Sequence, residues 1–197
     1  MLGPNGAGKT TLALVAATLL SPTSGHVRFG EWSVDAGGGA LRGRIGLVGH
    51  DLYVYADLSA AENLRFFARL YHVADVERRV GAALERAGLE ERREETIGSY
   101  SRGMRQRLAI ERALLHDPRL ILLDEPFTGL DDAATDALKG RLRDLRQSGR
   151  IVVVTTHDIE AVEGLADRAV VLQQGRLASV APGPGSLRER YRRQCAV

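Results

Sequence analysis

The stretch GPNGAGKT at residues 3–10 decides the fold class of this chain. It matches the pattern GxxxxGK[ST] at every fixed position, and a helix is predicted from Lys9 to Leu20. Glycines at these positions let successive backbone N–H groups turn inward toward phosphate oxygens, and the helix adds its positive N-terminal end. Lys9 is predicted to reach the β- and γ-phosphates, and Thr10 to offer a hydroxyl to Mg²⁺. A chance match is the alternative, since the chain holds 22 glycines.

Two acids follow a short apolar run in the second half of the chain. Residues 120–123 read LILL, which is typical of a strand buried on both faces of a parallel sheet, and Asp124 and Glu125 come next. Ligands of open α/β sheets lie at the carboxyl ends of the strands. Asp124 is therefore predicted to hold Mg²⁺ and Glu125 to polarise the attacking water as general base. The alternative is two solvated acids in the turn before Pro126.

Strands and helices alternate along the chain, which favours an α/β fold with a mostly parallel sheet. Between 58 and 115 the sequence predicts helices and no convincing strand, so this part is interpreted as a helical subdomain inserted in the α/β core. Residues 1–181 are expected to form one domain, and residues 182–197 a Pro/Gly linker and a basic tail. The expected strands are 26–29, 44–48, 120–123, 151–155, 169–172 and 176–180, with a glycine-rich loop at 36–43 and helices at 9–20, 59–72, 76–87, 101–117, 132–148, 161–166 and in the tail.

Composition excludes several classes of protein. The net charge of +2 is too small to imply a nucleic-acid partner. A single cysteine, Cys195, excludes an internal disulfide framework. The longest apolar run, Leu12–Leu20, has nine residues, whereas spanning a bilayer takes about twenty, so no membrane crossing is expected. No signal peptide is expected either, because a glycine-rich loop follows Met1 almost at once.

Five stretches, in this order, resemble the ATP-binding subunits of ABC transporters, and together they cover nearly the whole chain. They are GPNGAGKTT from Gly3, VGHDLYVYADLSAAENL from Val48, YSRGMRQR from Tyr100, LILLDEPFTGLD from Leu120 and TTHD from Thr155. The resemblance implies a P-loop NTPase fold of the ABC ATPase type, with ATP and Mg²⁺ bound. Within the family the strings are most similar to the ATPase of the cytochrome c maturation haem exporter, although multidrug and nodulation-type exporter ATPases share similar strings.

The resemblance also implies a set of site residues. Residues 100–104 align with the family signature LSGGQ, which binds the γ-phosphate held by the other protomer, so that two protomers sandwich two ATP molecules. Asp131 is expected to couple the two sites, and His157 to contact the γ-phosphate and orient water and Glu125; an ordinary surface or core histidine is the alternative. The nucleotide-binding residues implied are Gly3, Pro4, Asn5, Gly6, Ala7, Gly8, Lys9, Thr10, Thr11, Ser101, Arg102, Gly103, Met104 and Asp131.

Several positions depart from the family pattern. His50 stands where most relatives have glutamine; its imidazole is expected to serve in catalysis and at Mg²⁺, together with Thr10 and Asp124, and to make that role pH-sensitive. Arg102 replaces a signature glycine and either adds charge near phosphate or faces solvent, and Met104 replaces the signature glutamine. Only Met1 and Leu2 precede Gly3. The family's N-terminal β-layer and first core strand are therefore expected to be missing, as in an N-terminally truncated chain.

The function implied is that of the ATP-hydrolysing subunit of a membrane exporter of the haem and cytochrome c biogenesis type. It would act at the cytoplasmic face of the membrane as a homodimer or ATPase-domain pair, bound to separate transmembrane permease subunits and without direct cargo contact. Tyr53 and Tyr55 lie where the family docks the permease, although half-buried loop aromatics are an equal alternative. The competing functions are a multidrug-type exporter ATPase, a soluble ABC ATPase of translation or DNA repair, and an inactive truncated remnant.

Overall fold

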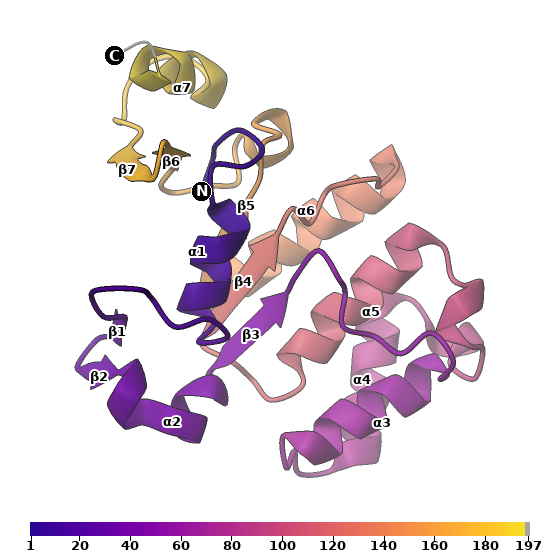
Figure 1. The fold of residues 1–197 in the computed structure, drawn as a ribbon. Helices are drawn as coiled ribbons and strands as arrows, with labels where there is room; N and C mark the ends of the chain where they lie inside the picture. The colour runs from indigo at the N-terminus through magenta and orange to yellow at the C-terminus, as the bar shows by residue number, and fades with distance from the viewer. Residues whose placement is uncertain (196–197) are drawn as a thin grey trace.

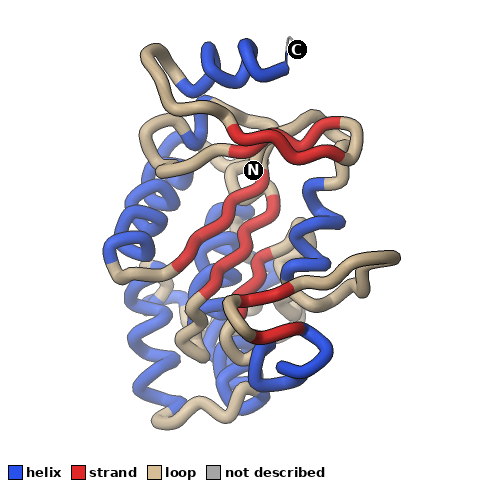
Figure 2. Tube along the Cα trace, turned by 90° about the vertical axis from the view of Figure 1, so that its left-hand side faces the viewer, coloured by secondary structure: helices blue, strands red, loops and turns tan. Residues whose placement is uncertain are grey.

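A parallel sheet of three strands forms the centre of the computed structural model, which describes residues 1–195, with the side chains of 34–37 and 195 left aside. The strands are β3 (Ile45–Val48), β4 (Leu120–Asp124) and β5 (Ile151–Thr155), in the spatial order β3-β4-β5. β4 lies in the middle because its residues are almost all apolar and buried. The parallel sheet of the predicted α/β fold is confirmed (Figures 1 and 2).

The register of the sheet brings the carboxyl ends of its strands to one edge. Val48 pairs with Leu123, and Asp124 pairs with Thr155. Leu2 adds a parallel bridge to Thr156 on one side and to Val171 on the other. The loop that follows Leu2 therefore begins at the same edge as Asp124 and Glu125.

Helices cover both faces of the sheet, and alternate residues of β4 point to the two layers. Leu122 packs in a cluster with residues of α1 (Lys9–Ala16) and α2 (Val34–Arg42). Ile121 and Leu123 pack instead against α5 (Arg102–Leu114) and α6 (Asp132–Gln147). This alternation places α1 on one face and α6 on the other.

The predicted helical segment forms a three-helix unit with a core of its own. It consists of α3 (Ala60–Leu70), α4 (Val76–Ala87) and α5, with the short turns η1 (Glu90–Arg92) and η2 (Ile97–Ser99) between α4 and α5. Ser59 and Glu62 form the predicted capping box at the start of α3, and Gly88 ends α4 in a left-handed conformation. α5 belongs to both cores, so it joins the unit to the sheet.

Two hairpins and two short helices complete the described chain. β1 (Arg28–Phe29) pairs antiparallel with β2 (Trp32–Ser33), and β6 (Val170–Gln173) pairs antiparallel with β7 (Arg176–Ser179). η3 (Glu160–Val162) follows β5, and α7 (Leu187–Cys195) ends the described part, so residues 196–197 of the predicted tail lie outside it. In the part of the chain that the structure describes, no helix combines the length and hydropathy needed to cross a bilayer.

Some helix and loop boundaries differ from those predicted from the sequence. The predicted loop at 36–43 is wrong, because most of it belongs to α2, which is interrupted at Gly38, where the backbone leaves helical geometry. Glycine richness favours a loop locally, but the packing of Leu41 of α2 against Ile45 and Leu122 overrides it here. The helix predicted for 9–20 ends at Ala16, because Thr18 adopts a positive φ of 64°. The helix predicted at 161–166 is the single 3₁₀ turn η3.

Candidate nucleotide-binding site

The loop at residues 3–8 has the backbone that its glycines allow. Gly6 and Gly8 have φ values of 78° and 96°, in a region that side chains with a Cβ rarely adopt. Gly8 is also the N-cap of α1, where the first N–H groups of the helix lack partners within the helix. The loop thus leads directly into the positive end of a helix, which is a favourable place for an anion.

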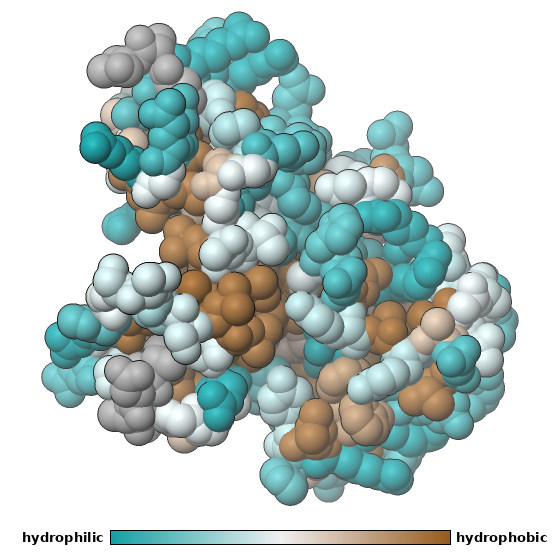
Figure 3. All heavy atoms as spheres, in the orientation of Figure 1, coloured by the Kyte–Doolittle hydropathy of each residue, from teal (hydrophilic) through white to brown (hydrophobic). Residues whose placement is uncertain are grey.

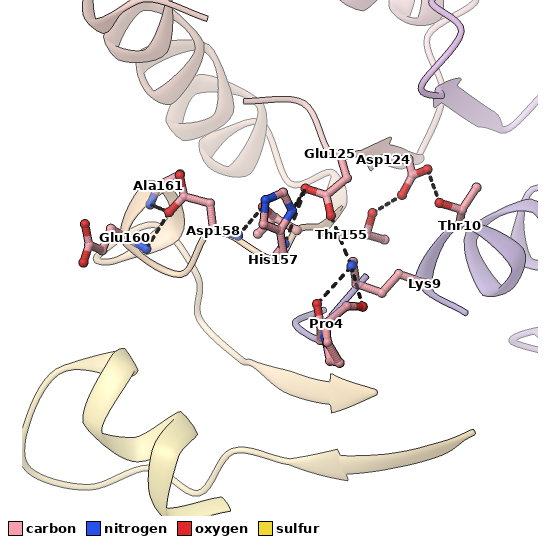
Figure 4. Close-up of polar contacts among 12 residues, drawn as sticks. Pro4, Lys9, Thr10, Asp124, Glu125, Thr155, His157, Asp158, Glu160 and Ala161 are labelled. Atoms are coloured by element: carbon pink, nitrogen blue, oxygen red, sulfur yellow. Dashed lines mark hydrogen bonds and ion pairs between the residues drawn. The ribbon is translucent and has the colours of Figure 1, made fainter. Parts of the chain in front are cut away.

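Lys9 lies inside this loop rather than in solvent. Its Nζ donates to the carbonyl oxygens of Gly3, at 2.9 Å, and Pro4, at 3.2 Å, and only 6% of the residue is exposed. The same ammonium lies 3.2 Å from Glu125 Oε1 (Figure 4). A buried ammonium with replaceable carbonyl partners can exchange them for phosphate oxygens.

Asp124 joins the loop helix to the sheet. Its Oδ2 accepts a hydrogen bond of 2.6 Å from Thr10 Oγ1, and its Oδ1 accepts one from Thr155 Oγ1 (Figure 4). Asp124 is only 4% exposed, and both of its carboxylate oxygens are satisfied by hydroxyls from elements far apart in the sequence. Thr155 was not among the predicted site residues; its position at the end of β5, beside β4, is the signal that identifies it.

Glu125 and His157 meet on the other side of Lys9. Glu125 Oε2 lies 3.0 Å from His157 Nδ1, and the backbone N–H of Glu125 donates to the Thr155 carbonyl at 2.9 Å. Glu125 has a left-handed backbone, with φ 48°, which directs its side chain toward the loop. Although burial acts to raise the pKa of the Glu125 carboxyl, the hydrogen bonds to His157 and Lys9 outweigh it and hold that pKa below 4.5.

Removing the histidine is predicted to raise the pKa of Glu125. In His157→Ala the strongest interaction that lowers this pKa is gone, and the Lys9 contact remains. The ionised form of Glu125 contributes folding stability that is present above pH 4.5 and is lost as the pH falls through the depressed pKa. Because the pKa of Glu125 is less depressed in the variant, the variant should lose less folding stability on acidification. The carboxyl ¹³C shift of Glu125, followed against pH, measures the change; an identical titration in parent and variant contradicts the assignment.

The predicted residues outside the phosphate loop, α1 and the acid pair lie on other elements. His50 is exposed and follows β3, whose carboxyl end neighbours that of β4. Ser101 is the N-cap of α5 and accepts from Met104 N, and Asp131 caps α6 through Ala134 N at 2.7 Å. The contacts of Arg102 and Gly103 are with residues 128–134 rather than with the phosphate loop. Their predicted role across a dimer stays a prediction.

The donor set fits ATP with Mg²⁺. Among the residues whose side chains the structure describes, no group of three or more His, Cys, Asp or Glu is arranged to hold a metal ion by itself. Mg²⁺ commonly takes only one or two protein oxygens and fills its other positions with phosphates and water. The Thr10 hydroxyl and the Asp124 carboxylate, already hydrogen-bonded to each other, are such oxygens.

The fold and the site define a P-loop nucleotide-binding domain. A family model described as "ABC transporter" matches residues 1–128. The linearmycin resistance ATP-binding protein LnrL of Bacillus subtilis (strain 168) is 33% identical over 91% of this chain and 58% of its own length. The daunorubicin resistance ATP-binding protein DrrA3 of Streptomyces coeruleorubidus is 39% identical over 90% of this chain and 57% of its own length. The chain belongs to the ABC transporter family.

A solved structure agrees with this assignment. The ATP-binding cassette MJ0796, described as a dimer in a post-hydrolysis state bound to ADP and Pi, superposes with a TM-score of 0.80 at 28% identity. The superposition covers 92% of this chain and 84% of that one. The chain spans less than three fifths of the two curated relatives above.

Proposed function

We propose that this chain binds ATP with Mg²⁺, hydrolyses it, and drives a membrane exporter as its ATP-binding subunit. The observation that carries the proposal is the convergence of Lys9, Asp124 and Glu125 at one edge of the sheet, with Thr10 and His157 as their partners. A cation for phosphates, oxygens for a divalent ion and a carboxylate for water are the parts that phosphoryl transfer to water requires.

In the proposed reaction each side chain has a defined task. The Lys9 ammonium leaves the loop carbonyls and binds phosphate oxygens, and Thr10 and Asp124 would hold Mg²⁺, which when bound would offset phosphate charge. A glutamate is already ionised at neutral pH at its ordinary pKa, and the lowered pKa of Glu125 keeps it so, so it can accept the proton of the attacking water. The water oxygen bonds to the γ-phosphorus, the bond to the bridging oxygen breaks, and ADP and phosphate leave. His157, bonded to Glu125, orients the carboxylate.

Hydrolysis is predicted to need the divalent ion. The purified chain should release phosphate from ATP in the presence of Mg²⁺ and stop when EDTA removes it, because the acid pair then repels the triphosphate. Phosphate release at saturating ATP, with and without excess Mg²⁺ over EDTA, measures this. Release that persists at an equal rate in EDTA, or its absence from the parent in Mg²⁺, contradicts the proposal.

Pairing with a second ATPase domain is part of the proposal. Ser101 and Gly103 stand at the start of α5, whose N-terminus can receive a γ-phosphate from another copy. The dimeric form in which the cassette MJ0796 was solved supports this arrangement. His50, at the end of β3, is proposed to assist at the metal and the water.

The proposed permease contact lies in an apolar groove beside the sheet. A cavity of about 420 Å³ opens between the end of α1 and the three-helix unit. Tyr53 and Tyr55, which are 44% and 50% exposed, lie at this cavity, and Figure 3 shows further apolar side chains exposed around α1 and α3. Exposed aromatics favour a protein partner. The lining includes Tyr53, Tyr55, Phe67, Tyr71, Arg112 and His116.

The most specific part of the proposal is the class of cargo that the transporter exports. The sequence strings favour a haem exporter, whereas LnrL and DrrA3 carry the names of drug-resistance proteins. These names support the multidrug-type alternative over the haem type. The chain would act at the cytoplasmic face of the membrane through separate permease subunits, and co-purification from membranes with those subunits tests this placement.

A further inference from the structure

Arg102 makes a contact that neither sequence interpretation anticipated. It is the first residue of α5, directly after the N-cap Ser101. Its Nε donates a hydrogen bond of 2.6 Å to the carbonyl oxygen of Thr128. Residues 100–104, which align with the family signature, are called the signature turn. The Arg102 guanidinium of this turn is thus bound to the loop that follows Glu125 in the same protomer.

The glycine that follows Thr128 leaves space for this contact. Gly129 has a φ of 70°, and a Cβ built on it would lie 2.8 Å from Arg102 Nε and 2.9 Å from Arg102 Cδ. Gly103, the next residue of α5, also lies close to α6, since a Cβ built on it would be 3.1 Å from the Cβ of Ala134. The signature turn therefore lies directly against the 128–134 segment, and Arg102 lies over its glycine.

The chain of contacts continues to the acid of the site. The N–H of Thr128 donates to the carbonyl of Glu125 at 3.2 Å, so Thr128 is bound through one peptide group to Glu125 and through the other to Arg102. Glu125 holds a left-handed backbone, which is strained for a residue with a Cβ and persists only where the surroundings fix it. Arg102 supplies one of the bonds that fix this turn.

We propose that Arg102 is a positioning residue that holds the 125–128 turn and, through it, the carboxylate of Glu125 in place for the attack of water. The inference rests on the proposed ATPase function and adds a link inside one protomer. Movement of the signature turn shifts Thr128 and so the backbone of Glu125. Binding at the signature turn is thereby connected to the protomer's own hydrolytic site.

The test compares Arg102→Ala, Arg102→Lys and a control, Arg143→Ala, which removes an exposed arginine of α6 away from this contact. Arg102→Ala should lower kcat about 10- to 100-fold, since small displacements of catalytic groups have effects of this size, with KM and ATP affinity within about twofold of the parent. Arg102→Lys should restore part of kcat, because its ammonium can still donate to the Thr128 carbonyl but lacks the rigid planar geometry of the guanidinium. Arg143→Ala should match the parent.

A second readout does not depend on turnover. Amide hydrogen exchange at Thr128, whose N–H is bonded to Glu125, should be faster in Arg102→Ala while thermal unfolding stays unchanged. The proposal is overturned by an unchanged kcat, by a rise in KM alone, which would mean direct nucleotide contact, or by unchanged exchange at Thr128. A parent without ATPase activity contradicts the proposed function instead, and the exchange rate then decides the positioning role.

Discussion

Lys9→Ala should lower the affinity for ATP about 10- to 150-fold. A charge-assisted hydrogen bond contributes about 1.5–3 kcal/mol, and each 1.4 kcal/mol corresponds to a tenfold change in the dissociation constant. Lys9 is almost fully buried, and its ammonium binds two loop carbonyls and Glu125, so alanine removes a cation that is held inside the loop. Calorimetric titration with ATP and Mg²⁺ measures the loss.

The matched control is Lys139→Ala, which removes the other lysine of the chain from α6. It should bind ATP as the parent does, because Lys139 lies on a helix that covers the sheet and not in the loop. Equal affinities in parent and Lys9→Ala would remove the phosphate-binding role of this loop.

Glu125→Gln should reduce turnover about 10²- to 10⁴-fold, the range that a general base contributes, and leave ATP binding intact. Glutamine keeps the shape, and its amide oxygen can still accept from Lys9, whereas its amide nitrogen donates where the carboxylate accepted and cannot take a proton from water. ATP should therefore accumulate on the variant, and ATP-dependent dimerisation should persist. Single-turnover phosphate release and light scattering with ATP measure the two properties.

Glu85→Gln, an exposed position of α4, is the control for the charge change and should hydrolyse ATP at the parent rate. If Glu125→Gln hydrolyses as fast as this control, Glu125 is not the base. If it loses ATP binding as well, the carboxylate serves the structure of the loop rather than the chemistry.

Local patterns predicted the strands and the acid pair well. The run at 120–123 predicted β4, and the position of Asp124 and Glu125 directly after it placed both at the edge where the loop begins. Ser59 and Glu62 predicted the start of α3 because a capping box is a contact within four residues. Such features depend on short stretches of chain, which is why the sequence reveals them.

Contacts between distant segments were beyond these patterns. The bond of Thr155 to Asp124 depends on the register of β4 and β5, and the bond of Arg102 to Thr128 depends on how α5 meets α6. From the sequence, Arg102 could either add charge near phosphate or face solvent, because an arginine at a helix start is compatible with both. α2 was missed because its glycines favour a loop, and its helical form depends on packing against β3.

The most direct measurement is a crystal structure of Glu125→Gln grown with ATP and Mg²⁺. The account predicts the triphosphate in the loop at residues 3–8, its terminal phosphate bound by Lys9 and the ion held by Thr10 and Asp124, with residue 125 facing the γ-phosphorus. A triphosphate bound elsewhere, away from the ends of β4 and β5, would contradict the account.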